Sequence, residues 1–153
     1  MKNINLPFVR ISMVRESPAK WRRTVSISSD SIAYRVLRHF FKDLDREHFL
    51  VCCLDAKNRI NAVQVVSIGT LTMALVHPRE VFKPAILSNS ARIIVAHNHP
   101  SGDPTPSVED ILLTERLVEA GKIIGIDVLD SLVFGAGCYR RVAEHSKKKK
   151  GKK

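Results

Sequence analysis

Two histidines separated by one residue, His97 and His99, follow an apolar run at residues 93–96. In an extended strand, residues i and i+2 point to the same face and lie roughly 6.5 Å apart along the chain. The two imidazole rings can therefore converge on one metal ion. Because ligand sites in open α/β sheets favour the C-terminal edge of the strands, we expect both histidines at that edge of a central strand covered on both faces.

A stiff turn and a helix start follow the histidines. Residues 100–106 contain three prolines and one glycine, a composition that ends a strand and stiffens the turn. Ser107 then has the position of a helix N-cap, which places Asp110 at the third helical position, where its carboxylate can face back over the helix start. Two imidazole nitrogens and one carboxylate oxygen suit zinc and leave a fourth tetrahedral position open, which is typical of a catalytic zinc site.

Each half of this pattern also has a simpler interpretation. A His-x-His pair is often no more than two polar residues at the end of a strand, and Ser-x-x-Asp is an ordinary helix-capping signal. The sequence favours a metal site because the pair, the stiff turn and the acid at a helix start occur together.

The stretch from Val76 to Gly125 closely resembles the bacterial RadC family. The resemblance is carried by His-Pro-Arg-Glu-Val-Phe at 77–82, Ala-His-Asn-His-Pro-Ser-Gly-Asp-Pro-Thr-Pro-Ser at 96–107 and Leu-Val-Glu-Ala-Gly-Lys at 117–122. More loosely, it extends over about residues 8–142. RadC proteins look like members of the JAMM (MPN-type, or JAB) zinc metalloprotease superfamily, whose pattern is a glutamate, then His-x-His, ten residues and an aspartate.

The resemblance implies a single MPN (JAB/JAMM)-like domain of the α/β class, in which a mixed β-sheet is wrapped by about three α-helices. It implies that His97, His99 and Asp110 together hold one Zn²⁺ per chain. Ser107 matches the superfamily serine, so its hydroxyl has two compatible tasks: it caps the helix, and it helps to hold the oxyanion of a tetrahedral intermediate.

One position departs from the family. At Asp130-Ser131, RadC sequences commonly have Asp-His. If that histidine supports the metal site, its replacement by serine changes the surroundings of the ligands.

The superfamily keeps its catalytic glutamate on a strand that follows a helix. Here an amphipathic stripe over residues 32–44 is followed by an apolar strand pattern at 47–54, which Glu47 opens. A carboxylate near zinc-bound water can take its proton and pass it to a leaving amine, and zinc lowers the pKa of that water toward about 7. Glu80 is the rival, but it follows Pro78 in the first turn of a predicted helix, where a negative charge suits the dipole. We therefore prefer Glu47 as the general base.

Hydrophobic patterns predict the remaining elements. We expect strands near residues 60–68, 71–76 and 128–134, and helices over 81–89 and 108–120. Pro84 predicts that the first of these helices kinks or begins late. Gly121 or Gly125 is expected to end the second.

The composition fits one globular domain. The chain has 153 residues, of which 44% are hydrophobic and 26% charged, enough to bury a core. We expect an N-terminal arm with a first strand at 1–26, the RadC-like domain at 27–144 and a basic tail at 145–153. The sequence shows neither a signal peptide nor a run of 18 apolar residues, which predicts a cytoplasmic protein without membrane contact.

The three cysteines support a reducing compartment. Cys52 and Cys53 are adjacent in a strand pattern, so their side chains are expected on opposite faces, where they cannot easily share an ion or a disulfide. Together with Cys138 they make an odd count without a Cys-x-x-Cys motif, which favours free thiols.

The formal net charge of +10 comes largely from the tail. Residues 147–153 carry six positive charges and no acid, which leaves +4 on the rest of the chain. Such a tail can contact nucleic acid without sequence preference, or it can simply favour solubility. A basic cluster around Trp21 has the same two interpretations, and we prefer a solvated edge.

Three functions are compatible with these features. The leading hypothesis is a zinc-dependent metallohydrolase that cleaves a peptide or isopeptide bond of a peptide or protein substrate. The alternative is a DNA-associated accessory protein, related to the repair role for which the RadC family is named, that binds through its basic surface and tail with a secondary metal site. A third is an inactive MPN-type scaffold, against which the intact ligand pattern argues.

Overall fold

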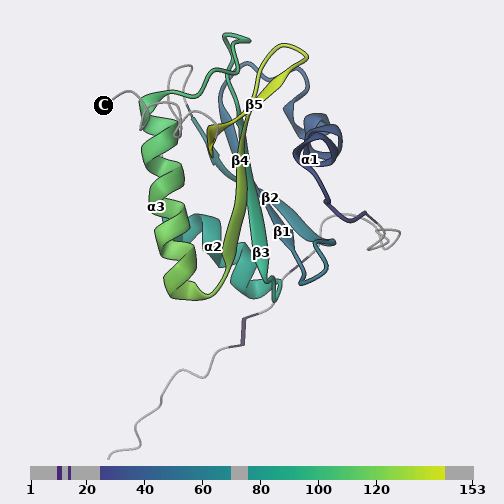
Figure 1. Cartoon of the computed structure of the whole chain (residues 1–153), viewed down its shortest axis with the longest axis vertical. Helices are drawn as coiled ribbons and strands as arrows, with labels where there is room; N and C mark the ends of the chain where they lie inside the picture. Colours follow the sequence, from purple (N-terminus) through teal and green to yellow (C-terminus); the bar gives the residue numbers. More distant parts are fainter. Residues whose placement is uncertain (1–9, 12–13, 15–24, 70–75, 144–153) are drawn as a thin grey trace, which may run out of the picture.

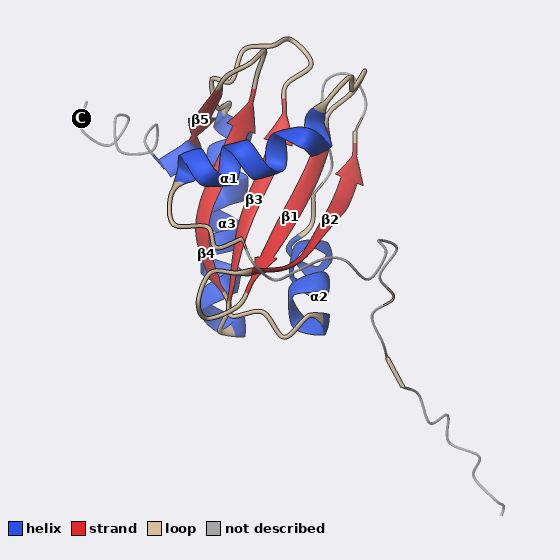
Figure 2. Cartoon of the chain, turned by 90° about the vertical axis from the view of Figure 1, so that its right-hand side faces the viewer, coloured by secondary structure: helices blue, strands red, loops and turns tan. Residues whose placement is uncertain are grey.

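A five-stranded mixed sheet forms the middle layer of the domain (Figure 1). The computed structural model describes residues 10–11, 14, 25–69 and 76–143. Within them the chain forms, in order, α1 (Asp30–Leu37), the 3-10 helix η1 (Arg38–Phe41), β1 (His48–Leu54), β2 (Ile60–Ile68), α2 (Pro78–Leu87), β3 (Arg92–Asn98), α3 (Val108–Ile124), β4 (Asp127–Phe134) and β5 (Tyr139–Arg141). Helix α1 crosses one face of the sheet, whereas α2 and α3 cover the other (Figure 2). The predicted α/β architecture with three helices is confirmed.

The strand order β2-β1-β3-β4-β5 puts β3 in the centre of the sheet. Strand β3 pairs antiparallel with β1 and parallel with β4, and α3 is the crossover that joins the parallel pair. Residues 93–98 of β3 are all buried. The prediction of a central strand, covered on both faces and ending at the histidines, is therefore confirmed.

The sheet separates two hydrophobic cores. One lies under α1 and includes Cys52, and the other lies under α2 and α3 and includes Cys53. The adjacent cysteines thus point to opposite faces, as predicted. Both are fully buried free thiols, and burial raises the pKa of Cys52 to about 12 and that of Cys53 to about 11. Such buried thiols remain protonated and are poor nucleophiles at neutral pH.

Helix α3 begins and ends with recognisable signals. Ser107 and Asp110 form a reciprocal capping box at its start, and Gly125 ends it with a left-handed φ of 80°. Gly121 lies inside the helix, because the helix extends four residues beyond the predicted end at residue 120. Of the two glycines that the sequence offered as helix ends, Gly125 is the one used.

Helix α2 begins at Pro78, which agrees with the expectation that Glu80 lies in the first turn of a helix after Pro78, whereas the expectation that Pro84 delays the start of the helix was wrong. Pro78 occupies the first turn, where a missing N–H costs no helical hydrogen bond, and the side chain of His77 caps the helix by accepting a bond from Arg79 N–H at 3.2 Å. Pro84 is accommodated inside the helix and is buried.

At a few other places the structure differs from the expectations, or the expected element falls on residues that the structure does not describe. Ser26 forms only an isolated bridge with Arg59, and strand β5 was not predicted. The strand expected at 71–76, the basic cluster around Trp21, most of the N-terminal arm and the basic tail lie largely or wholly outside the described residues. Across the described ranges, none of the helices has the length and apolar character needed to cross a membrane.

Candidate metal centre

Three side chains converge at the C-terminal end of β3. His97 Nε2 lies 3.2 Å from His99 Nε2 and 3.0 Å from Asp110 Oδ1, and His99 Nε2 lies 3.4 Å from Asp110 Oδ2. The histidines come from β3 and the residue that follows it, and Asp110 comes from the first turn of α3. These three residues form a group that could hold a metal ion.

The spacing of the donor atoms fits a tetrahedral metal ion. Zinc bonds of about 2.0–2.1 Å to nitrogen or oxygen place neighbouring ligand atoms about 3.3 Å apart in a tetrahedron. The separations of 3.0, 3.2 and 3.4 Å are of this size, with His97 measured to Oδ1 and His99 to Oδ2 of the same Asp110 carboxylate. Little rearrangement would therefore be needed for the three side chains to bind an ion of this size.

The local structure holds the rings in the orientation that a metal needs. His99 Nδ1 hydrogen-bonds the carbonyl oxygen of Asp103 at 2.8 Å, so the other ring nitrogen is directed toward Asp110. Such bonds to the second nitrogen orient metal-binding histidines and fix their tautomer. The His97 ring, only 2% exposed, stacks on Phe49 with centroids 5.8 Å apart.

Electrostatics favour the charged form of Asp110. Burial alone would raise the pKa of its carboxyl, but the hydrogen bonds from His97 and His99 outweigh burial and hold that pKa well below its usual range. In return, the hydrogen bond to Asp110 raises the pKa of the His99 imidazole despite partial burial. A permanently ionised carboxylate between two imidazoles is suited to attract a divalent cation.

Glu47 lies beside this group. It immediately precedes β1, and the Phe49↔His97 pairing of β1 with β3 brings it to the same end of the sheet. Burial raises the pKa of its half-buried carboxyl, and its pKa also responds to the charges of His97, Asp110 and His99. The carboxylate is therefore close enough to interact electrostatically with all three candidate ligands.

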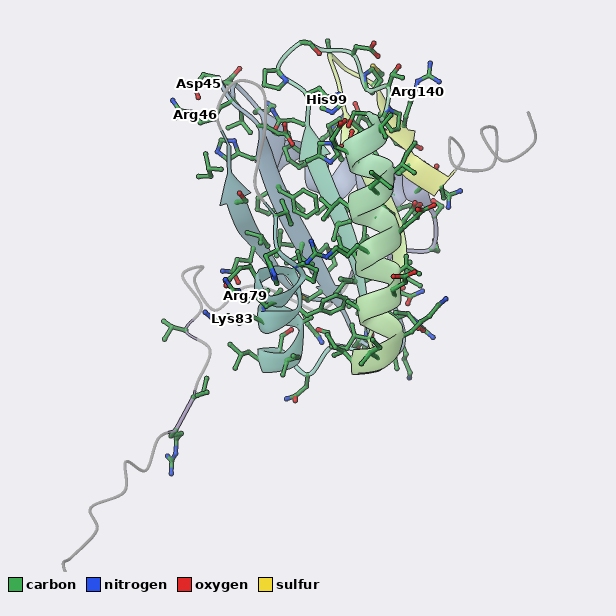
Figure 3. The ribbon with its side chains drawn as sticks, turned by 90° about the vertical axis from the view of Figure 1, so that its left-hand side faces the viewer. Asp45, Arg46, Arg79, Lys83, His99 and Arg140 are labelled. Atoms are coloured by element: carbon green, nitrogen blue, oxygen red, sulfur yellow. The ribbon has the colours of Figure 1, made fainter. Side chains whose placement is uncertain are left out.

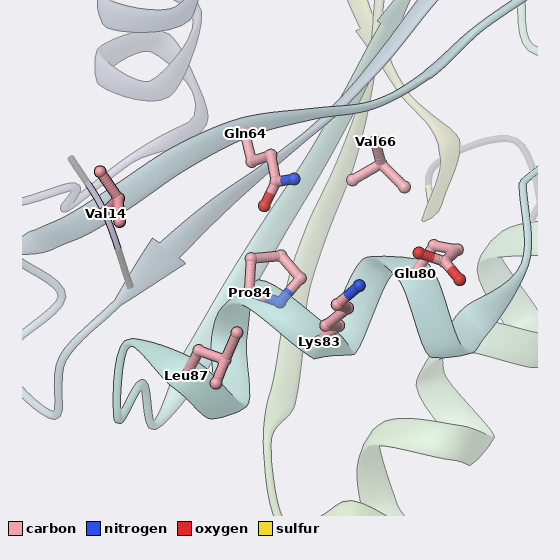
Figure 4. Close-up of a pocket in the computed structure, with 7 residues that line it drawn as sticks. All are labelled: Val14, Gln64, Val66, Glu80, Lys83, Pro84 and Leu87. Carbon is pink, nitrogen blue, oxygen red and sulfur yellow. The ribbon is translucent and has the colours of Figure 1, made fainter. Parts of the chain in front are cut away.

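Glu80 lies elsewhere. It is in the first turn of α2, as predicted, where it faces a groove between α2 and β2 with Gln64, Val66 and Lys83 (Figure 4). Its carboxylate lies 3.6 Å from Arg79 Nε, and Figure 3 shows Arg79 and Lys83 well below His99. The arrangement thus favours Glu47 over Glu80 as the acid near the candidate ligands, although the role of general base stays a prediction.

Ser107 is bonded as a helix cap. Its Oγ accepts a hydrogen bond from Asp110 N–H at 3.1 Å, while its own N–H donates to Asp110 Oδ2 at 2.7 Å. The capping task that the sequence suggested is confirmed, and a role in holding an oxyanion stays a prediction. The Asp110 carboxylate therefore has two contacts: it caps the start of α3 through Ser107 N–H, and it faces the two histidines.

The serine that replaces the family histidine is well accommodated. Ser131 is 3% exposed, lies on β4 and accepts a hydrogen bond from Thr114 Oγ at 3.1 Å. Thr114 is one helical turn after Asp110 on α3. The pair therefore links α3 to the sheet just beyond the candidate ligands.

Sequence reasoning missed the residues that support the site through the backbone. Asp103 orients His99 through its carbonyl oxygen, and the side chain of Asn98 bonds the backbone on both sides of Glu47. A contact through a backbone carbonyl cannot be predicted from the type of residue. An asparagine between two candidate ligands, in contrast, could have been noticed in the sequence. Arg46 and Arg140 flank His99 at the same edge of the domain (Figure 3).

Gly135 allows the turn after β4 to contact the loop that follows His99. Ala136 N–H donates to Gly102 O at 2.9 Å, and a Cβ on Gly135 would collide with that same Gly102 oxygen and would lie 2.8 Å from Pro104 Cδ. We expect Gly135→Ala to displace this loop, and with it the Asp103 carbonyl that orients His99. If these residues hold a metal ion, the affinity for zinc as the probe ion should fall about 10- to 100-fold, the usual effect of disturbing a ligand's supporting contact, as measured by competition with a chromophoric chelator.

Gly121→Ala is the matched control for this variant. A Cβ there would lie 2.5 Å from Ile126 O, so the crowding is similar, but it occurs at the far end of α3. It should lower the free energy of unfolding by about 1–3 kcal/mol and leave zinc affinity unchanged. An equal loss of affinity in both variants would contradict the specific role of Gly135.

Comparison with known proteins identifies similar sequences. A family model described as a RadC-like JAB domain matches residues 27–147. A UPF0758 protein of Desulforamulus reducens is 62% identical over 94 residues, which are 61% of this chain and 41% of the relative. A UPF0758 protein of Methanosarcina barkeri is 50% identical over 113 residues, which are 74% of this chain and 49% of the relative. The chain spans about half the length of the curated relatives it matches.

Proposed function

The chain belongs to the RadC-like JAB domain family, and from this membership we propose that it is a zinc-dependent hydrolase of the JAMM type that cleaves peptide or isopeptide bonds. The observation that carries the proposal is the convergence of His97, His99 and Asp110, with donor separations of 3.0–3.4 Å, at one end of the central strand. Two imidazoles and one carboxylate are a common donor set of catalytic zinc sites, in which a fourth position stays open.

The donor chemistry favours zinc and other transition metals over magnesium and calcium. Imidazole nitrogen suits zinc and other transition metals, whereas magnesium and calcium prefer all-oxygen sites. His97 and His99 would bind the ion through Nε2, and Asp110 through a carboxylate oxygen. When bound, zinc supplies Lewis-acid chemistry, which acidifies water and polarises a carbonyl group.

We assign the proton transfer to Glu47, which is supported by the response of its pKa to the charges of all three candidate ligands. Its carboxylate would accept the proton of the water that attacks the scissile carbonyl carbon, and would then donate that proton to the nitrogen of the leaving amine as the C–N bond breaks. Ser107 Oγ accepts the capping bond from Asp110 N–H, so its hydroxyl hydrogen can rotate about Cβ–Oγ and would donate to the carbonyl oxygen as negative charge develops there. Peptides or proteins would be the substrates, and the three free cysteines favour a cytoplasmic location.

Zinc content tests the metal site directly. Protein purified without chelator is expected to contain about one zinc per chain, and His99→Ala should lose it because two remaining ligands hold the ion much less tightly. Glu47→Gln should retain it, because Glu47 lies outside the ligand group. The measurement is elemental analysis of the three proteins side by side.

The result that contradicts the proposal is a wild-type protein that takes up no zinc even after supplementation. In that case the alternative of a DNA-associated protein would gain weight. It predicts nucleic acid binding that disappears when residues 147–153 are deleted and survives His99→Ala.

A further inference from the structure

We propose that Asn98 is a positioning residue that fixes Glu47 relative to the metal ligands; this inference rests on the proposed function. Asn98 lies between His97 and His99 in sequence and is only 7% exposed. Neighbouring residues on a strand point to opposite faces, so the Asn98 side chain is not expected to bind the metal together with His97 and His99. Its side chain is used instead to bond the backbone of another strand.

The contacts of Asn98 enclose Glu47 in the chain. Asn98 Oδ1 accepts a hydrogen bond from His48 N–H at 2.8 Å, and Asn98 Nδ2 donates to Arg46 O at 3.1 Å. One amide group therefore bonds the residue before Glu47 and the residue after it. The last backbone pair of β1 with β3 is Phe49↔His97, so the side chain of Asn98 continues this ladder past the point where the backbone pairing stops.

A second contact holds Glu47 from the opposite side. The carbonyl oxygen of Glu47 accepts a hydrogen bond from Gly69 N–H at 2.8 Å, just beyond β2. Hydrogen bonds to the backbone therefore hold the chain at Glu47 from the β2 side through Gly69 and from the β3 side through Asn98. Of these contacts, only those of Asn98 come from the strand that leads to both histidines.

This arrangement gives Glu47 a fixed place with respect to His97 and His99. On the side that faces β3, Glu47 lies beyond the last backbone pair, and chain segments without such pairing are free to fray. A catalytic group must keep its position to a fraction of an ångström to be effective. Asn98 meets this need because it is rigidly connected to both ligands through the backbone of residues 97–99.

The two hydrogen bonds from Asn98 to the backbone around Glu47, which we call the clamp, predict a change in backbone hydrogen exchange that does not require a bound metal. In zinc-free protein, Asn98→Ala should speed exchange of the His48 amide about tenfold or more, since the amide loses its acceptor, while the amides of Val51 and Cys53 stay protected. Asn98→Leu, which fills a similar volume without a polar atom, serves if the alanine variant does not fold. A His48 amide that exchanges equally fast with and without Asn98 overturns the inference.

Cobalt spectroscopy tests whether the clamp acts through Glu47. The visible spectrum of cobalt-loaded protein at one fixed pH is compared for wild type, Glu47→Gln, Asn98→Ala and the double variant. Asn98→Ala should retain one cobalt per chain and change the spectrum in the same direction as Glu47→Gln, and the double variant should match Glu47→Gln alone. A wild-type spectrum in Asn98→Ala, or changes that add in the double variant, overturn the inference.

Asn61→Ala is the matched control. Asn61 is also a buried asparagine, 5% exposed, but its amide bonds Ser88 O and Ser90 Oγ near the end of α2. Its removal should leave both the His48 amide and the cobalt spectrum unchanged. Failure of the wild-type protein to bind cobalt would contradict the proposed hydrolase and the catalytic meaning of the clamp together, whereas cobalt binding with an unaltered Asn98→Ala spectrum would contradict the clamp alone.

Discussion

Glu47→Gln is expected to lower the turnover number by about 10²- to 10⁴-fold, the usual contribution of a positioned general acid or base. Glutamine is nearly isosteric with glutamate, so it removes the proton acceptor and leaves the packing. The Michaelis constant and the zinc content should change little, because Glu47 is not among the residues that form the ligand group. The measurement is steady-state cleavage of a peptide or isopeptide substrate, selected from a library by turnover with the wild-type protein.

Glu80→Gln provides the control for this prediction. Glu80 belongs to the same family motif, but it lies on α2 with its carboxylate beside Arg79, and its replacement should change turnover by less than about twofold. Comparable losses in the two variants would contradict the assignment of Glu47. A normal rate in Glu47→Gln would require another proton acceptor at this end of the sheet.

Replacement of Asp110 is expected to separate two contributions of one carboxylate. Asp110→Ala removes a proposed metal ligand and also the acceptor for Ser107 N–H, whereas Asp110→Asn keeps an oxygen that can accept this bond. In chelator-treated protein, the alanine variant should therefore lose about 0.5–2 kcal/mol of unfolding free energy and the asparagine variant clearly less. Denaturant unfolding followed by circular dichroism measures the difference.

With zinc present, both Asp110 variants should lack the stabilisation that zinc gives the wild type, and the difference between them should remain. Wild-type protein gains about 2.7 kcal/mol of stability when free zinc is 100 times its dissociation constant, and neither variant should gain a comparable amount. Equal stability of the two variants in chelator would count against the capping contribution. A full zinc-dependent gain in either variant would instead remove Asp110 from the ligand set.

The sequence was sufficient to predict that the three candidate ligands lie together, because they are close to one another along the chain. His97, His99 and Asp110 fall within 14 residues, and strand periodicity, a stiff turn and a helix-capping signal place them without knowledge of the rest of the fold. Glu47 is different. It lies about 50 residues earlier, and its approach to the ligands depends on the register of β1 with β3, which only the family resemblance could supply.

The contacts of Asn98 were not predicted for the same reason. They join its side chain to two backbone groups of another strand, and backbone partners depend on register rather than on residue type. The late start of α2 that Pro84 suggested was wrong, because the helix accommodates Pro84 and begins at Pro78 with a cap from His77. Strand β5 has three residues, too few for a clear alternating pattern.

The order of the strands in the sheet has a consequence for synthesis of the chain. Strand β1 is an inner strand, yet its second neighbour, β3, is made only after α2. During synthesis, the β1–β2 hairpin therefore precedes β3 and has one apolar edge unpaired, and such edges promote aggregation. Until residues 92–98 have been synthesised, this hairpin therefore exposes an edge with which another chain could pair.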